Sequence, residues 1–229
     1  EKFETLIGLF SINEQPTGDK DPFSLRRNAI GLIRILIEKN IPLNFSKLID
    51  KHTPKDKKDS GNNLKAFIYE RLSNYLKDKN FTSSEVDAVI SSRPYQLNDI
   101  ISKLEAIKIF STLEQSKDLA SANKRVSNIL KKYTGSIRKV DESLLEEVEE
   151  IQLFKTIAKL NPIIIEDLSE KNFIGALNSL VDLKDPIDQF FENVMVNSKD
   201  EKIKMNRHNL LKHLHISLNT VADISKLAN

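Results

Sequence analysis

Hydrophobic residues recur along this chain with the period of an α-helix. Residues 64–76 show the pattern most clearly, because Leu64, Phe67, Ile68, Leu72 and Leu76 follow the spacing that lines one side of a helix. The same period predicts helices over about 1–13, 22–39, 84–91, 97–112, 115–132, 141–160, 173–180 and 199–226. We find no segment with the alternating pattern of a β-strand. The sequence therefore predicts an all-α fold, a helical bundle.

The turn before the second predicted helix has well-defined local signals. Pro16 restricts its own φ angle and Gly18 tolerates a positive one, so both are typical of turns. Asp21 lies where a side chain can accept hydrogen bonds from the free N–H groups of a new helix, and Pro22 suits the first helical position. We therefore predict that a buried helix begins at Pro22 and that Phe23 lies on its apolar face.

Composition limits the class of protein. Of the 229 residues, 39% are hydrophobic and 30% are charged, which is typical of a soluble globular chain. No apolar run is long enough to predict a membrane span. The absence of cysteine excludes disulfides and thiolate metal sites or nucleophiles within this chain, and it suits a reducing compartment. We expect a cytoplasmic protein.

The formal net charge of +2 conceals an uneven distribution along the chain. Residues 61–140 carry 14 Lys and Arg against 8 Asp and Glu, whereas residues 141–229 carry 10 against 16. A basic middle next to an acidic end indicates one surface that faces a polyanion and another that does not. A second reading remains open, in which the acidic half of a non-catalytic helical module docks onto a basic protein partner and has no RNA role.

A polar stretch suggests how the chain is divided. Residues 52–61 are polar or charged and contain no apolar anchor, so we predict an exposed linker there. The expected organisation is one helical part over residues 1–51, the linker over 52–61, and a larger helical domain over 62–229.

Several segments of the chain resemble the β subunit of bacterial tetrameric glycyl-tRNA synthetase. The resemblance begins at residues 1–10 and continues through 16–27 and 28–35. It returns at residues 67–72, 122–130, 140–146, 190–196, 206–207 and 221–225. These segments keep one order and together span nearly the whole chain.

The resemblance implies a fold and a function. Residues 1–51 would be the last helices of an HD-like domain, and residues 62–229 a DALR-type anticodon-binding domain. The chain would recognise tRNA(Gly) within an α2β2 enzyme that ligates glycine to tRNA, and the α subunit would carry out the chemistry. The resemblance implies no catalytic residue and no cofactor in this segment, while the complete enzyme would use ATP with Mg.

The predicted helix over 115–132 contains the best candidates for RNA contact. Lys124, Asn128 and Lys131 recur at i, i+4 and i+7, on a side away from the apolar stripe. Lysine and arginine neutralise phosphates, while asparagine can hydrogen-bond the edges of unpaired bases. The predicted tRNA-binding residues are Arg71, Lys124, Arg125, Asn128, Lys131 and Lys132. The alternatives are a solvated helix face and, for Asn123 and Asn128, hydrogen bonds between helices.

The tyrosines, the histidines and the acidic run each allow more than one interpretation. Tyr69, Tyr75 and Tyr133 are either stacking platforms for bases or core residues. His208 and His215 share a helix face with Lys212 between them, and a lysine there argues against a metal site. The acidic run over residues 146–150 is predicted to be a solvated helix start. We recognise neither a pair of catalytic carboxylates nor a phosphate-binding loop.

Overall fold

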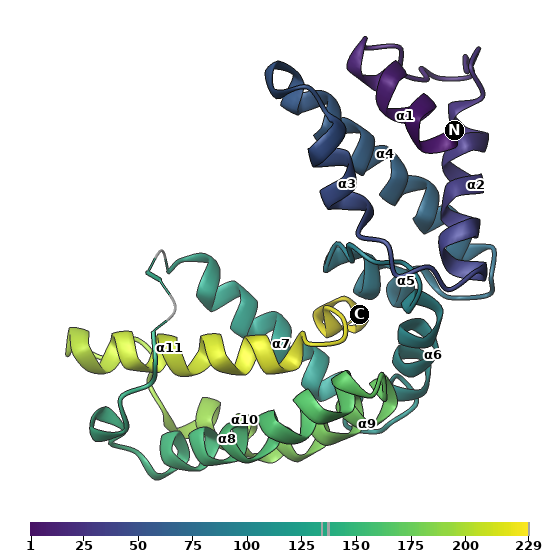
Figure 1. The fold of residues 1–229 in the computed structure, drawn as a ribbon. Helices are drawn as coiled ribbons and strands as arrows, with labels where there is room; N and C mark the ends of the chain where they lie inside the picture. The colour runs from purple at the N-terminus through teal and green to yellow at the C-terminus, as the bar shows by residue number, and fades with distance from the viewer. Residues whose placement is uncertain (134, 137, 229) are drawn as a thin grey trace. The chain divides into compact units, whose positions relative to one another are not determined.

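The computed structural model describes residues 1–133, 135–136 and 138–228. Within these ranges the regular structure is helical and no β-strand occurs, which confirms the all-α prediction (Figure 1). Contacts divide the chain into two compact units, which we call unit 1 (Glu1–Leu104) and unit 2 (Glu105–Asn229). None of the described helices is both long and apolar enough to cross a membrane.

Unit 1 is organised around one long helix. It contains α1 (Lys2–Ser11), α2 (Leu25–Glu38), α3 (Phe45–His52), η1 (Lys55–Lys57), α4 (Lys58–Lys77), α5 (Ser83–Ser91) and the first part of α6 (Ile100–Phe110). Helix α4 packs against α1, α2, α3 and α5. Its apolar stripe of Leu64, Ile68, Leu72 and Leu76 is buried, as the helical spacing predicts.

Helix α2 begins three residues later than predicted. Ser24 has a φ of 54°, in the left-handed region, so the chain turns before Leu25 instead of continuing as a helix from Pro22. The Asp21 carboxylate still caps the new helix, because it accepts hydrogen bonds from the backbone N–H groups of Leu25 at 2.7 Å and Arg26 at 3.0 Å. Phe23 consequently lies outside the helix and is 47% exposed.

The predicted linker over 52–61 contains regular structure. Residues 55–57 form η1, and α4 already begins at Lys58. Ser60 and Gly61 are buried, and a Cβ atom on Gly61 would lie 2.9 Å from the Oγ1 of Thr53. The missing side chain therefore lets a polar helix start pack closely against Thr53. Contacts divide the two units between Leu104 and Glu105.

Unit 2 contains α7 (Ser116–Lys131), η2 (Glu142–Leu144), α8 (Val148–Ser169), α9 (Phe173–Ser179), η3 (Leu180–Leu183), α10 (Lys184–Asn193), α11 (Glu201–Leu218) and η4 (Ile224–Leu227). Helix α11 packs against α7 and α8, while η4 packs against α7. Pro162 lies inside α8, although proline usually starts or interrupts a helix. The buried Leu160 and Ile164 continue the apolar face across it, so packing favours one helix over two.

A buried ion pair joins α8 to α11. Arg207 donates from Nε to Oε1 of Glu150 at 2.8 Å and from Nη2 to Oε2 at 3.0 Å. Oε2 of Glu150 also accepts the backbone N–H groups of Glu146 and Glu147, at 3.1 and 3.0 Å. These bonds to the Glu150 carboxylate raise the pKa of Arg207. The acidic run is thus not wholly solvated, because Glu150 is fully buried.

The same helix fixes the segments on either side of it. Nη1 of Arg207 donates to the carbonyl of Met195 at 2.8 Å, which anchors the connection between α10 and α11. The amide of Asn206 accepts the N–H of Asp141 at 2.8 Å and donates to its carbonyl at 2.9 Å. Asn206 and Arg207 therefore hold two loops at the amino-terminal end of α11.

Candidate nucleic-acid interface

Helix α7 has one face toward the core of unit 2 and one toward solvent. Leu119 and Val126 are buried on the inner face together with Asn123. The Asn123 amide exchanges two hydrogen bonds with that of Asn219, at 2.9 and 3.1 Å. Asn123 therefore makes a hydrogen-bonded contact between two segments of unit 2, which is the alternative given for it above.

The outer face of α7 carries a row of lysines. Lys124 and Lys131 are exposed there, and Lys132 follows directly after the helix. Lys131 donates a hydrogen bond to Oδ1 of Asn128 at 3.3 Å. Lys117, seven residues before Lys124, is also exposed and extends the row by two turns, although it is not among the predicted tRNA-binding residues. We call Lys117, Lys124, Lys131 and Lys132 the α7 lysine row.

The lysines of the row differ in how they interact with the dipole of α7. Lys131 and Lys132 lie at the carboxyl end of α7, where a positive side chain is favourable beside the helix dipole. Lys117 and Lys124 lie away from that end and gain nothing comparable. Their charges therefore remain available to an external anion.

Arg125 lies at the edge of this surface. Its guanidinium carbon sits 4.0 Å from the centre of the Phe191 ring. It also borders a shallow hollow that is lined by Asp118, Asp188 and Glu192. Because these carboxylates offset its charge, Arg125 is less suited to a phosphate than the lysine row is.

Arg71 belongs to the other unit and makes contacts within it. Its guanidinium lies 4.4 Å from the centre of the Phe67 ring, and Nη1 is 2.7 Å from Oε1 of Glu70. The side chain is only 13% exposed. Tyr69, on the same helix, packs its ring against Phe45 with the centroids 5.5 Å apart. Both side chains therefore contribute to the packing of unit 1.

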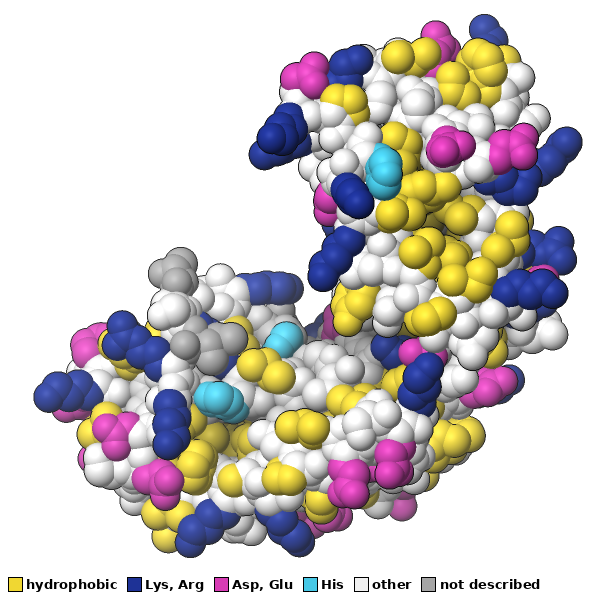
Figure 2. All heavy atoms as spheres, in the orientation of Figure 1, with side chains coloured by type: hydrophobic (Ala, Val, Ile, Leu, Met, Phe, Trp, Pro, Cys, Tyr) yellow, Lys and Arg dark blue, Asp and Glu magenta, His cyan; other side chains and the backbone are white. Residues whose placement is uncertain are grey.

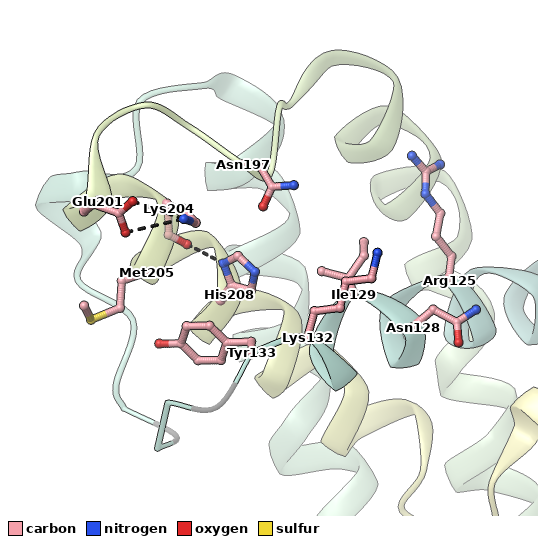
Figure 3. Close-up of a pocket in the computed structure, with 10 residues that line it drawn as sticks. All are labelled: Arg125, Asn128, Ile129, Lys132, Tyr133, Asn197, Glu201, Lys204, Met205 and His208. Atoms are coloured by element: carbon pink, nitrogen blue, oxygen red, sulfur yellow. Dashed lines mark hydrogen bonds and ion pairs between the residues drawn. The ribbon is translucent and has the colours of Figure 1, made fainter.

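A groove of about 820 Å³ lies between α7, the 194–200 loop and α11. One wall of the groove is formed by α7 and the two residues after it, namely Arg125, Asn128, Ile129, Lys132 and Tyr133 (Figure 3). The opposite wall is formed by Asn197, Glu201, Lys204, Met205 and His208. Three predicted residues, Arg125, Asn128 and Lys132, thus meet residues from two distant segments in one hollow.

The base of this groove is a stacked pair of rings. The rings of Tyr133 and His208 are 4.5 Å apart and inclined by 19°. Nδ1 of His208 donates to the carbonyl of Lys204 at 2.7 Å, because a carbonyl can only accept. Lys212 lies 4.4 Å from the centre of the Tyr133 ring. Tyr133 therefore lines a surface groove and is not a core residue.

His215, which the sequence places on the same helix face as His208, contacts Ser127. Nε2 of His215 is 3.0 Å from Oγ of Ser127, and burial lowers the pKa of His215. Among the described residues no three His, Cys, Asp or Glu side chains are grouped so that they could hold a metal ion. On the face drawn in Figure 2, Lys and Arg are mixed with Asp and Glu over unit 2, so the visible charge is not of one sign.

Comparison with known families identifies both parts of the chain. The family model described as the glycyl-tRNA synthetase beta subunit matches residues 1–91. The model of the DALR anticodon binding domain matches residues 119–226, which contain most of α7 and all of α8 to α11. The chain is therefore similar to the glycyl-tRNA synthetase β subunit over its first part and to a DALR anticodon binding domain over its second.

Individual members of the β-subunit family align along the whole chain. The glycine–tRNA ligase beta subunit of Acidovorax ebreus (strain TPSY) is 43% identical over 231 residues, which is 100% of this chain and 32% of the relative. The subunits of Janthinobacterium sp. (strain Marseille) and Methylobacillus flagellatus are also 43% identical, over 100% of the chain and 33% of each relative. The chain thus spans about a third of the length of these β subunits.

No sequence pattern indicates the far wall of the groove. Asn197 and His208 lie 65 or more residues after α7, and no local pattern connects them to it. Lys117 could have been predicted from the sequence, because its seven-residue spacing from Lys124 places both side chains on one helix face.

Proposed function

We propose that this chain is the tRNA-recognition part of a glycine–tRNA ligase β subunit. Unit 2 would bind tRNA(Gly) through the α7 lysine row, and residues 1–51 of unit 1 would be the last helices of an HD-like domain. The observation that carries the proposal is the exposed row of four lysines within or beside the region that matches an anticodon-binding domain.

The proposal extends to the complete enzyme. This segment would contribute tRNA binding and no catalytic group, while an α subunit in an α2β2 assembly would bind ATP with Mg and glycine and carry out the ligation in the cytoplasm. The relatives' name, glycine–tRNA ligase beta subunit, supports the presence of a further subunit.

Salt dependence tests the binding role. If four lysines contact phosphates, the affinity for tRNA(Gly) should fall roughly 50-fold between about 50 and about 200 mM salt, because each contact releases condensed counterions. Filter binding or fluorescence anisotropy at several salt concentrations measures the slope. Weak binding with less than about a threefold change would favour the docking-module alternative, since few phosphates would then be neutralised.

A further inference from the structure

Two polar contacts join α7 to α11 inside unit 2. The helices contact each other and run in opposite directions (Figure 1). The amides of Asn123 on α7 and Asn219 at the end of α11 exchange two hydrogen bonds, at 2.9 and 3.1 Å. One turn later on α7, Oγ of Ser127 lies 3.0 Å from Nε2 of His215, which is one turn earlier on α11. We call these two contacts the polar rungs.

The first rung is surrounded by apolar side chains. Asn123 is 0% exposed, and its neighbours on the same face of α7, Leu119 and Val126, are equally buried. A buried amide without a partner is costly, so the Asn123 amide requires the donor and the acceptor that Asn219 supplies. Asn219 is itself held in place, because its Nδ2 also donates to the carbonyl of His215 at 2.6 Å.

Apolar packing alone would not fix how the two helices are aligned. Leucines recur on the buried side of α11 at Leu211, Leu214 and Leu218, so a shift by one turn would again place leucines in the core. Apolar side chains that exchange places in a core reduce its uniqueness before they reduce its stability. The same shift keeps at most one polar rung between the helices. Each buried polar group that it leaves unpaired disfavours the shifted alignment by roughly 5- to 150-fold.

The alignment of α7 on α11 also decides where the α7 lysine row lies. Lys124 follows Asn123 directly, and Lys131 lies one turn after Ser127, so the rungs and the charges belong to one helix. A shift of α7 by one turn would move the row by about 5.4 Å relative to α11. The cations of the two helices would then present a different pattern to a polyanion.

We propose that the two polar rungs hold α7 in one alignment on α11 and thereby position the α7 lysine row for tRNA. The positioning residues are Asn123, Ser127, His215 and Asn219. Buried polar pairs have a comparable role in coiled coils, where they select one register at a cost in stability. The inference rests on the proposed function, because the position of the row matters to binding only if the row contacts tRNA.

The distance between two spin labels measures the alignment in the full chain. Labels attached at Ser121→Cys on α7 and Lys202→Cys on α11 use exposed positions. The chain contains no other cysteine, so no further site takes a label. With the polar rungs intact, we expect one distance.

The variant Asn123→Leu/Ser127→Ala/His215→Leu/Asn219→Leu replaces both rungs. It should show a second distance, different by up to about 5.4 Å, in about half of the molecules or more. Its midpoint of unfolding in urea should stay within about 0.5 M of the wild-type value, because replacing both partners by apolar groups is nearly neutral. If this variant does not fold, Asn123→Leu/Asn219→Leu carries the same test with only the buried rung replaced.

The affinity for tRNA(Gly), measured on the unlabelled chains, should follow the aligned fraction. The apparent Kd should rise by the inverse of the fraction of molecules that keeps the wild-type distance, so a fraction of about one fifth gives a loss of about fivefold. A change in stability alone would not produce this proportion. The matched control Leu119→Met/Leu214→Met alters buried side chains of the same two helices and should keep both the single distance and the affinity.

Three results would overturn the proposal in distinguishable ways. A single, unchanged distance in a folded variant without the rungs would show that apolar packing sets the alignment. A second distance with unchanged tRNA affinity would reject the positioning role. Absence of tRNA binding by the wild-type chain would reject the proposed function and the positioning role together, while the distances would still decide whether the rungs fix the alignment.

Discussion

Replacing Glu150 with alanine is expected to lower the free energy of unfolding of unit 2 by about 3–5 kcal/mol. The change leaves the Arg207 guanidinium buried without its carboxylate partner, in a residue that is only 5% exposed. It also removes the acceptor for the N–H groups of Glu146 and Glu147. The substitution therefore removes both an ion-pair partner and a hydrogen-bond acceptor at one buried position.

Hydrogen exchange during urea unfolding measures this effect in unit 2 separately. Peptides from α8 and α11 report on the altered unit, and peptides from α4 report on unit 1 as an internal reference. Glu149→Ala is the matched control, because Glu149 lies in the same helical turn but is only partly buried. A loss below about 1 kcal/mol for Glu150→Ala would show that the ion pair does not hold α8 against α11.

Removing three cations from the α7 lysine row is expected to weaken tRNA binding by about 10- to 100-fold at low salt. The variant is Lys124→Ala/Lys131→Ala/Lys132→Ala. Each lost phosphate contact should also lower the salt slope by about one. Helix stability should fall by no more than about 1 kcal/mol, because the high helix propensity of alanine partly offsets the loss of two cations beside the helix dipole.

The control removes the same charge elsewhere in unit 2, through Lys155→Ala/Lys159→Ala/Lys226→Ala. These three lysines are exposed and lie on α8 and η4. Titrations of both variants with tRNA(Gly) at several salt concentrations separate a local surface from total charge. Equal losses for the two variants would mean that the binding is nonspecific attraction to a basic chain.

The helices could be predicted because each one carries its own apolar stripe. The stripe of α4 and the two faces of α7 follow directly from the 3.6-residue period. Lys124 and Lys131 are accordingly exposed, as their spacing indicates. The local periodicity of apolar residues was sufficient to predict a helix wherever one of its faces packs against a single core.

Predictions failed where backbone conformation or tertiary contact outweighed the local signal. The positive φ of Ser24 delays α2, and no residue-type preference indicates it. Gly61 reads as part of a linker, but it permits a close contact with Thr53. Glu150 looks like one more acidic residue at a helix start until Arg207, 57 positions later, is placed beside it.

The groove could not have been assembled from the sequence. Its base and walls combine Asn128, Asn197 and His208, which three separate segments bring together. The ring stack depends on Tyr133, which lies beyond the end of α7 at Lys131. Such a constellation depends on packing between helices, for which a single sequence carries no periodic signal.

Site-specific photocrosslinking tests the central claim most directly, namely that tRNA lies along the outer face of α7. A photoreactive residue would replace Lys124 in one variant and Ile165, which is 66% exposed on α8, in another. We predict a strong crosslink to tRNA(Gly) from position 124 and little from position 165. Crosslinking from position 165 with none from position 124 would contradict the account.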